Sequence, residues 1–481
     1  MKKKLLLLSF IEGAAVMAAE LCGAKLLAPI FGSSLVVWAS VMGITLAALA
    51  AGYFFGGRIS HQTKNHRQTL FRILAGAALF ITLMPVLSYY LVPRISYLPF
   101  LSGVVLSTFS ILFFPIFFLG AASPLFIVLQ THKETEAGRV SGTVYAVSTA
   151  GGILATFLCG FFIIPVFGLS QCLIFFGSLL LLTNFLVFRS VKVLHLFFFV
   201  LFVYLNFQFI SKSSGTLFSS DSIQGHLEVQ DVARGADSVR LLTINDIIQS
   251  EMNVQTHRSV SAYVRLLDSL VPNSIMTGNA LVLGLGAGLT ANMVVEKNYS
   301  TDGVEFDDRI IESAKHYFYL NKNVNTTHAD ARFFLNSCTK KYDIVLADLF
   351  KAEEQPSHVL TLESLTALKK NLQEGAIVLV SWHGYLSEEK GRGSVILVNT
   401  FVKAGYFVKL CAMSHDERFR NIVFVASLNK LPELPFELHE EMAKIDLINT
   451  DDAPRLEKYN AEANKAWRTQ YLRYYQNAAV N

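Results

Sequence analysis

The sequence predicts two fused parts, a polytopic α-helical membrane domain of about seven spans and a doubly wound α/β domain preceded by a small β-element. Three observations predict this fold class. The chain of 481 residues is 52% hydrophobic and only 16% charged, which is too apolar for an ordinary soluble protein. Residues 1–210 hold four acidic and 13 basic side chains, whereas residues 211–481 hold 33 and 28. Beyond residue 255, short apolar strands alternate with helical segments, as in layered α/β domains.

We therefore divide the chain into a membrane domain at 1–210, a linker with a β-element at 211–255, and an α/β domain at 256–481. The α/β domain has an acidic balance and no basic stripe, which argues against nucleic-acid binding. The five cysteines stand singly, so their spacing predicts neither a metal site nor a disulfide framework.

A helix that crosses a membrane needs about 20 apolar residues. The lysine-rich start resembles a signal peptide, but the apolar stretch continues without a release point, so we expect a retained first span. Pro115 and Pro124 interrupt the fourth segment, which we expect to form one span with a kinked or interfacial extension. Small residues recur along these segments, as close helix packing in lipid requires. The expected spans are residues 5–29, 35–56, 69–92, 99–129, 140–166, 169–187 and 194–210.

The loop charges predict the orientation of these spans. If the spans alternate, almost all loop lysines and arginines fall on one side, and Arg94 alone falls on the other. The positive-inside rule then places the N-terminus in the cytoplasm. Seven spans would deliver residue 211 to the opposite side, and the side of the α/β domain stays open.

Three charged residues lie in or near the first span, Glu12, Glu20 and Lys25. The two glutamates are eight residues apart, so they share roughly one helix face. A charge at membrane depth is costly and usually marks a functional site. The alternative is structural: Glu12 lies near the interface, and Glu20 pairs with Lys25.

Two strand-like segments and an amphipathic helix precede the main strands of the α/β domain. In it, an apolar strand ends at Gly284, and Gly286 and Gly288 follow before a helical pattern. Such glycines allow a tight turn and close approach of a ligand to the backbone. The expected strands are 225–231, 238–244, 280–283, 302–306, 342–348 and 376–382, and the expected helices are 256–270, 289–297, 309–319 and 362–371.

Three acidic residues stand at strand ends, Glu305, Asp330 and Asp348. Glu305 follows Gly286 by 19 residues, the spacing at which a carboxylate can take both hydroxyls of a ribose. The carboxyl ends of parallel strands meet at one edge of a sheet, so the glycine turn and the three acids together predict a nucleoside site. Each acid alone is also compatible with a helix cap or a loop-ordering role.

These motifs make the chain resemble the membrane-fused, spermidine synthase-like bacterial proteins, a branch of the aminopropyltransferases with the Rossmann-like S-adenosylmethionine methyltransferase fold. The motifs that carry the resemblance are the glycine loop Gly284–Gly288, Glu305-Phe-Asp307, Asp330-Ala-Arg332, Tyr342-Asp343 through Asp348, and the segment from Pro356 to Gly375. The first span contains Glu20-Leu21, and Leu27-Ala-Pro-Ile-Phe-Gly-Ser33 follows a few residues later. This pattern also matches the N-terminal part of the same branch. The resemblance implies a multi-pass protein of the bacterial inner (cytoplasmic) membrane.

The resemblance also implies roles for individual residues. Glu305 would hold the ribose, Asp330 and the backbone of Ala331 would read the adenine edge, and Asp348 would be the catalytic base. Gln224 and Gln249 would reach over the nucleoside from the β-element. Residues 349–358, including Lys351 and His358, would form a lid.

The chain departs from the family pattern at three places. Ala287 replaces the usual Asp of the glycine loop, and Lys351 stands where a second lid Asp is expected. The upstream Tyr-His-Glu signature is absent, and Tyr263 is its nearest counterpart. A cation at a polyamine-binding position repels the usual substrate, which argues against putrescine as the acceptor.

The leading hypothesis is a membrane-embedded transferase that uses S-adenosylmethionine or its decarboxylated form, with methylthioadenosine as product and no metal. The acceptor would be a small molecule or a lipid at the bilayer, and the chain could self-associate as a homo-oligomer. The alternatives are a methyltransferase on the same fold, and a transporter or sensor that binds a nucleoside without chemistry.

Overall fold

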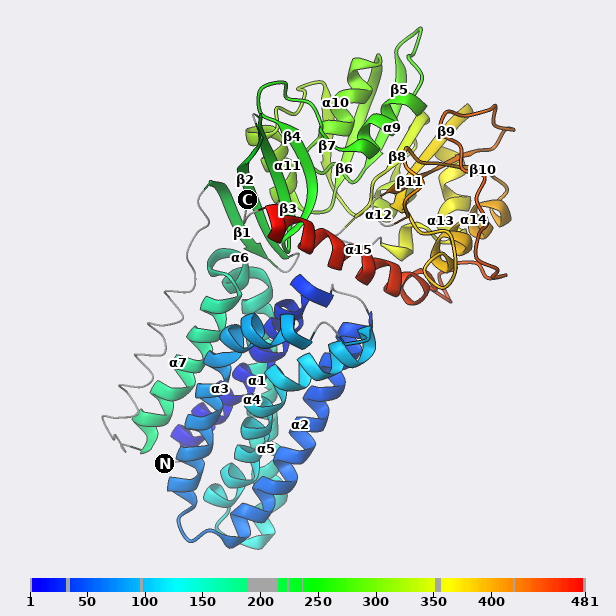
Figure 1. The fold of residues 1–481 in the computed structure, drawn as a ribbon. Helices are drawn as coiled ribbons and strands as arrows, with labels where there is room; N and C mark the ends of the chain where they lie inside the picture. The colour runs from blue at the N-terminus through cyan, green and yellow to red at the C-terminus, as the bar shows by residue number, and fades with distance from the viewer. Residues whose placement is uncertain are drawn as a thin grey trace. The chain divides into compact units, whose positions relative to one another are not determined.

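The computed structural model describes residues 2–31, 35–95, 98–188, 215–222, 225–235, 237–350, 356–417 and 420–478. It divides into two compact units (Figure 1). Residues 1–213 and 220–225 form the first unit, and residues 214–219 and 226–481 form the second. Gln224, Lys351 and the expected span at 194–210 lie outside the described residues.

The first unit is a bundle of long apolar helices. Six of them are long and apolar enough to cross a membrane, counted over the described residues alone. The helices are α1 (Lys2–Phe31), α2 (Leu35–Gln62), α3 (His66–Ile95), α4 (Phe100–Gln130), α5 (Ala137–Leu158), α6 (Ile164–Phe167) and α7 (Leu169–Phe188). They follow the first six expected spans, and α4 is one continuous helix despite its two prolines.

A π-helical turn, Cys159–Ile163, separates α5 from α6. The expected span at 140–166 therefore contains a change of helix type that hydropathy does not reveal. At this turn the Cys159 sulfur lies 3.5 Å from that of Cys172 on α7. The two cysteines are free thiols and fully buried, so the fold brings together two residues that the sequence shows as isolated.

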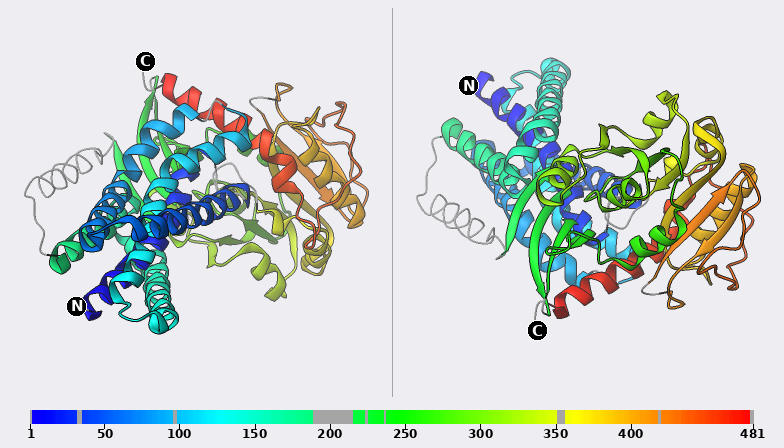
Figure 2. Two further views of the ribbon diagram at one scale, coloured as in Figure 1. Left: turned by 90° about the horizontal axis from the view of Figure 1, so that it is seen from below. Right: turned by 90° about the horizontal axis from the view of Figure 1, so that it is seen from above.

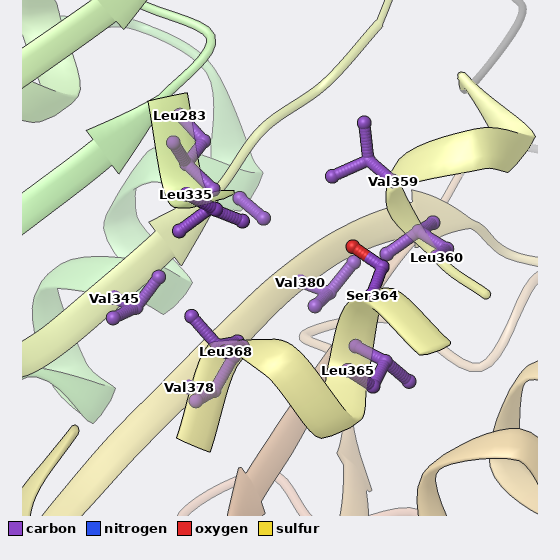
Figure 3. A pocket seen from close by; sticks show the side chains of 11 residues that line it. Leu283, Leu335, Val345, Val359, Leu360, Ser364, Leu365, Leu368, Val378 and Val380 are labelled. Atoms are coloured by element: carbon purple, nitrogen blue, oxygen red, sulfur yellow. The ribbon is translucent and has the colours of Figure 1, made fainter. Parts of the chain in front are cut away.

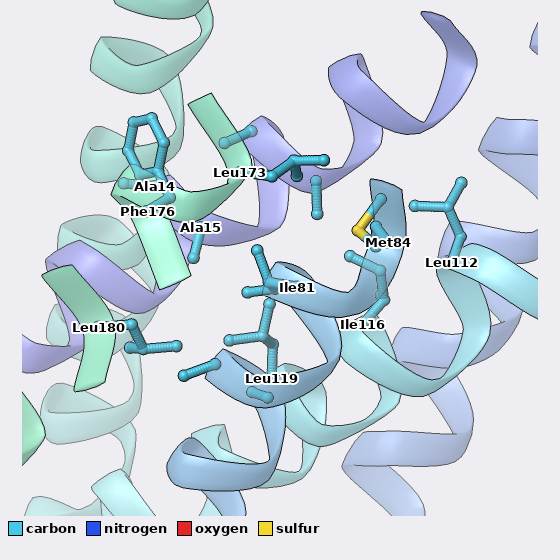
Figure 4. Packing of buried hydrophobic residues seen from close by; sticks show 14 of the residues in the cluster. Ala14, Ala15, Ile81, Met84, Leu112, Ile116, Leu119, Leu173, Phe176 and Leu180 are labelled. Carbon is cyan, nitrogen blue, oxygen red and sulfur yellow. The ribbon is translucent and has the colours of Figure 1, made fainter. Parts of the chain in front are cut away.

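Glycines allow the helices of this unit to pack closely. A Cβ at Gly151 on α5 would lie 1.9 Å from the Phe10 carbonyl oxygen of α1, and one at Gly52 on α2 would lie 2.4 Å from the Phe117 oxygen of α4. Any larger residue would force these helices apart. Around these contacts, apolar side chains of α1, α3, α4 and α7 interdigitate (Figure 4), which is the dispersion-driven packing expected of helices in lipid.

The second unit contains two sheets. The smaller has the order β1-β2-β3-β4, and β3 pairs antiparallel with both β2 and β4. Its strands are β1 (Thr216–Ser222), β2 (Gly225–Arg234), β3 (Asp237–Ile244) and β4 (Ile247–Asn253). This sheet is the small β-element that the alternation of residues 225–245 predicts.

The larger sheet has seven strands in the order β10-β11-β9-β8-β5-β6-β7. Figure 2 shows the ribbon of its strands and helices in two further views. The five strands from β9 to β7 in that order are parallel. The strands are β5 (Gly278–Leu283), β6 (Tyr299–Glu305), β7 (Val324–His328), β8 (Tyr342–Ala347), β9 (Leu372–His383), β10 (Phe407–Cys411) and β11 (Asn421–Ser427).

Apolar clusters cover both faces of this sheet. Helices α9, α10 and α11 contribute to one cluster, and α12, α13 and α14 to the other. The helices are α9 (Ala262–Leu270), α10 (Leu289–Glu296), α11 (Asp308–Tyr317), α12 (Ala331–Ser337), α13 (Leu362–Leu368), α14 (Arg392–Lys403) and α15 (Leu456–Ala478). Coverage of both faces buries the parallel strands, as the apolar sequences of β5 and β8 require.

Two details differ from the sequence prediction. The sheet is mixed, because β11 runs antiparallel to its neighbours β9 and β10 at one edge. The expected helix at 256–270 begins only at Ala262, because His257 has a positive φ of 56°. The stretch from Tyr459 to Tyr475, which the sequence predicts as a surface helix packing on the domain, belongs to α15, whose Trp467 and Arg468 are 8% and 2% exposed.

Candidate active site

The glycine turn after β5 forms the centre of the site. Gly284, Gly286 and Gly288 have φ values of 82°, 53° and 76°, a region that side chains disfavour. A Cβ at Gly284 would also lie 2.2 Å from the carbonyl oxygen of Asp348. The turn therefore requires glycine, both for its backbone conformation and for its contact with the end of β8.

Ser250 of β4 fixes the turn from the side of the small sheet. Its hydroxyl accepts a hydrogen bond from the amide of Ala287 at 3.1 Å, and Ala287 is fully buried. Ala287, which replaces the Asp that the family pattern leads us to expect, thus packs against the β-element. Sequence reasoning missed Ser250, because nothing in a strand pattern shows which residue will meet a distant turn.

Glu305 ends β6 beside the glycine turn. One carboxylate oxygen accepts the amides of Leu285 and Gly286 at 3.0 and 3.3 Å. The other oxygen accepts the amides of Phe306 and Asp307 at 2.8 and 3.1 Å. Although these bonds lower it, burial raises the pKa of Glu305 above its ordinary value.

A carboxylate offers about four lone-pair positions, and these four amides occupy them. Glu305 therefore holds the glycine turn against β6 in this structure. Its expected grip on ribose hydroxyls stays a prediction, and it requires that a ligand replace at least one of the amide contacts.

Asp348 follows β8 next to the glycine turn. The Tyr263 hydroxyl of α9 donates a hydrogen bond to its Oδ2 at 3.1 Å. Removal from water raises the pKa of Asp348 to about 6, although the hydroxyls of Tyr263 and Ser381 lower it. A carboxyl with such a pKa is a better proton acceptor near neutral pH than an ordinary aspartate.

Asp330 is the N-cap of α12, where its Oδ1 accepts the amide of Phe333 at 3.0 Å. Its Oδ2 lies 3.0 Å from Nε2 of His358. Partial burial raises the pKa of Asp330, but His358 and the Phe333 amide outweigh burial and lower the pKa below its ordinary value. The capping role that the sequence left open is therefore present, and Ala331 is the buried first residue of α12.

A C-terminal segment binds to the last residues of the expected lid and to the residues just after it. Arg332 donates to Asp451 through two bonds at 3.0 and 2.8 Å and to the carbonyl of His358. The amide group of Asn449, which is fully buried, donates to the carbonyls of Ser357 and Leu360 at 3.0 Å each. We call this set of bonds the C-terminal clasp.

Of the remaining predicted residues, Gln249 is half-buried on β4 and donates to the Ile247 carbonyl at 3.3 Å. The expected lid is described at residues 349–350 and 356–358 only. Among the described residues, no group of three or more His, Cys, Asp or Glu is placed to hold a metal ion. Glu20 and Lys25 are half-buried on α1, and their ion pair stays a prediction.

Aromatic side chains surround the end of β9, beside the strand that leads to Asp348. The His383 ring lies 5.2 Å from that of Phe350 and 4.7 Å from that of Trp467 on α15. His383 is fully buried. Sequence reasoning missed both His383 and Trp467, since Trp467 reaches this place only through the packing of the C-terminal helix.

A small cavity lies deeper in the domain, between α12, α13 and strands β5, β8 and β9 (Figure 3). Leucine and valine side chains line it, and Ser364 is the polar residue among the ones shown. It has none of the strand-end carboxyls in its wall, so it is a packing defect of the core and no part of the site.

The sheet order and the glycine turn after β5 define a Rossmann-like α/β domain. Residues 262–390 match the family model of the spermine/spermidine synthase domain. The part of the second unit from residue 262 to residue 390 is therefore similar to this domain.

Individual relatives match part of this domain. An N-terminal histidine N-methyltransferase of Emericella nidulans is 29% identical over 131 residues, which are 26% of this chain and 24% of the relative. A polyamine aminopropyltransferase of Vibrio vulnificus is 32% identical over 108 residues, which are 21% and 36% of the two chains. The chain thus spans a quarter to about a third of the length of these relatives. The crystal structure of a probable spermidine synthase from Corynebacterium glutamicum is similar with a TM-score of 0.39 and 16% identity, over 46% of this chain and 82% of that one.

Proposed function

We propose that this chain is a membrane-embedded transferase of the spermidine synthase-like type. In this proposal it binds a nucleoside derived from S-adenosylmethionine and transfers an aminopropyl or related alkyl group to an acceptor held beside Asp348. The observation that carries the proposal is the position of Asp348, whose carboxyl accepts a bond from Tyr263 and whose backbone carbonyl adjoins the glycine turn. The matched family and the name of the Vibrio vulnificus relative support it.

The residues of the turn fit a nucleoside. The positive φ values at Gly284, Gly286 and Gly288 leave the backbone without side chains where a ligand would approach. Glu305 and Asp330 stand at the ends of β6 and β7, within reach of a sugar and a base. The donor substrate supplies a sulfonium, whose neighbouring carbon is open to attack by an amine.

Asp348 would act on the acceptor. An aliphatic amine is protonated near neutral pH, and its lone pair is needed for the attack. The carboxylate takes a proton from the ammonium, the nitrogen forms a bond to the carbon, and the carbon–sulfur bond breaks with its electron pair going to sulfur. Tyr263 orients the carboxylate through its hydrogen bond at 3.1 Å, and methylthioadenosine leaves.

The six apolar helices of the first unit support a location in a membrane. The lid position where relatives would carry an acidic residue is Lys351 in this chain. A cation there disfavours a second ammonium in the acceptor by Coulomb repulsion. We therefore propose an acceptor other than the usual diamine, and a small molecule or lipid at the bilayer fits best.

Methyl transfer is the second candidate function. The similarity to the N-terminal histidine N-methyltransferase favours it, since both reactions use the same kind of nucleoside site. The products differ, because methyl transfer releases S-adenosylhomocysteine and aminopropyl transfer releases methylthioadenosine.

The test uses the full chain in lipid nanodiscs with S-adenosylmethionine or its decarboxylated form and a panel of amines and aminolipids. Release of methylthioadenosine supports the proposal, and release of S-adenosylhomocysteine supports the second candidate. A thermal-shift titration with both donors and methylthioadenosine tests binding alone. No stabilisation by any of them would refute a nucleoside site. Reporter fusions at residue 215 would determine on which side of the membrane the second unit lies.

A further inference from the structure

Glu12 is a buried carboxyl inside the helical unit. It lies on α1, is 2% exposed, and its Oε2 accepts a hydrogen bond from the Ser148 hydroxyl of α5 at 2.9 Å. Within the described part of the chain, its Oε1 accepts no hydrogen bond. One oxygen of this carboxyl is therefore available to a further donor.

Glu12 lies deep within the bundle. It is ten residues from the start of α1, which is about 15 Å along the helix axis. A spanning α1 that keeps Lys2–Lys4 at the membrane surface places Glu12 eight residues, about 12 Å, beyond the last lysine, inside a hydrocarbon core about 30 Å thick. The structural alternative, in which Glu12 lies near the interface, stays a prediction.

Two tyrosines contribute further polar groups at this level. Tyr53 of α2 and Tyr145 of α5 meet edge to face with ring centroids 6.4 Å apart, and Tyr145 is three residues before Ser148 on α5. Neither phenol hydroxyl makes a hydrogen bond among the described residues. Both rings keep an accessible face, with 38% and 43% exposure. Three helices thus bring a carboxyl, a serine hydroxyl and two phenols together in an apolar bundle.

The charges around Glu12 leave it without a counter-ion. No lysine or arginine pairs with it among the described residues. An ionised carboxylate in apolar surroundings costs several kcal/mol unless a cation accompanies it. Metal ions such as Ca²⁺ and Mg²⁺ take six or more oxygen ligands, more than this site offers. A primary ammonium has three N–H donors and also binds to aromatic faces, so it fits one carboxylate, neighbouring hydroxyls and two tyrosine rings.

We propose that the helical unit binds the primary ammonium group of an aliphatic amine at Glu12, with Tyr53 and Tyr145 as its aromatic walls. This inference rests on the proposed function, because it takes the first unit as the membrane part of an amine-using transferase. It assigns to that unit a binding site of its own, separate from the acceptor position beside Asp348.

The test measures equilibrium binding of radiolabelled spermidine to the full chain in nanodiscs of neutral lipid. Asp348→Asn removes the acceptor site and should leave one class of binding sites. Adding Glu12→Gln to that variant should weaken the remaining binding at least tenfold, because glutamine keeps the volume and the acceptor for Ser148 but loses the charge. Glu134→Gln, at an exposed glutamate, is the matched control and should bind as the parent chain does.

Tyr53→Phe provides a second measurement that leaves the Glu12–Ser148 bond intact. It should weaken spermidine binding about threefold in the Asp348→Asn background. Equal affinity with and without Glu12→Gln would overturn the inference, as would unchanged affinity in Tyr53→Phe. Failure of the proposed function has a different signature: no methylthioadenosine or S-adenosylhomocysteine forms, whatever the spermidine titration shows.

Discussion

Glu12 and Asp348 make an instructive pair, because each is a carboxyl withdrawn from water and held by a hydroxyl. Ser148 donates to Glu12 at 2.9 Å, and Tyr263 donates to Asp348 at 3.1 Å. Their surroundings differ. Asp348 stands at the end of a parallel strand, next to a turn whose glycines leave backbone accessible. Glu12 stands in the middle of a helix, with close-packed helices around it.

The difference shows how the two architectures place a reactive group. A parallel sheet collects several side chains at one edge, so Asp348 has Glu305, Asp330 and the glycine turn as neighbours in the same rim. A helical bundle satisfies its backbone internally, so its polar groups are side chains of facing helices, such as Glu12 and Ser148. The strand edge therefore suits chemistry on a large substrate, and the bundle suits recognition of one small charged group.

The largest effect is expected from Asp348→Asn. The asparagine cannot take a proton, and loss of a general base typically costs between about 100-fold and 10,000-fold in rate. We expect kcat to fall about 1,000-fold while the donor nucleoside still binds, measured by product release and thermal shift. Glu312→Gln, an exposed acid of α11, should be unaffected. Retention of turnover in Asp348→Asn would show that Asp348 is not the base.

Gly284→Ala should have the next largest effect. The alanine Cβ would lie 2.2 Å from the Asp348 carbonyl oxygen, and φ is 82°. Gly375→Ala is the matched control, because its φ is 76° and no atom lies within 4 Å of the added Cβ. We expect the control to cost about 1 kcal/mol of unfolding free energy from backbone strain alone. Gly284→Ala should cost at least twice that and should weaken nucleoside binding, and equal costs would refute the close approach of the turn to β8.

Tyr263→Phe tests the hydroxyl beside Asp348. Activity needs the ionised carboxylate, so kcat/KM of the parent chain should fall as pH drops through about 6, the raised pKa of Asp348. The Tyr263 bond favours the ionised form, and its loss should raise that pKa by about one unit. The acidic limb of the pH–rate profile should therefore move to higher pH. A limb that does not move would mean that another group controls it.

The smallest effect is expected from His358→Gln. The His358–Asp330 pair is solvent-exposed, with side-chain exposures of 54% and 33%, and such pairs contribute between about 0 and 1 kcal/mol. We expect a change of at most a few degrees in thermal midpoint, and a salt dependence weaker than that of the parent. A loss of activity far beyond this would show that His358 itself contacts substrate.

Sequence patterns predicted the parts of the molecule that depend on local periodicity. Six of the apolar segments are helices, and the glycine turn and strand-end acids occupy the predicted edge of the sheet. The main-sheet strands that the sequence predicted are parallel to one another, but two further strands after residue 404, β10 and β11, form an antiparallel edge that returns along β9. Helix and strand signals alone give no direction for such an edge strand.

The contacts that long-range packing creates could not be predicted. Tyr263 lies 85 residues before Asp348, Ser250 lies 37 residues before Ala287, and Trp467 is 84 residues beyond His383. Glu305 stands where the spacing places it, but its four amide partners follow from the turn's three-dimensional shape. Residue types and spacing therefore located the site, and folding determined which groups touch there.

The C-terminal clasp has a consequence for where the catalytic domain ends. The family match stops at residue 390, yet Asn449 donates to the carbonyls of Ser357 and Leu360, and Asp451 accepts from Arg332. Truncation after residue 430 would remove these anchors from the segment at residues 357–360. The shortest fragment of the second unit that keeps these contacts must therefore extend past residue 456. That is well beyond residue 390, where the family match ends.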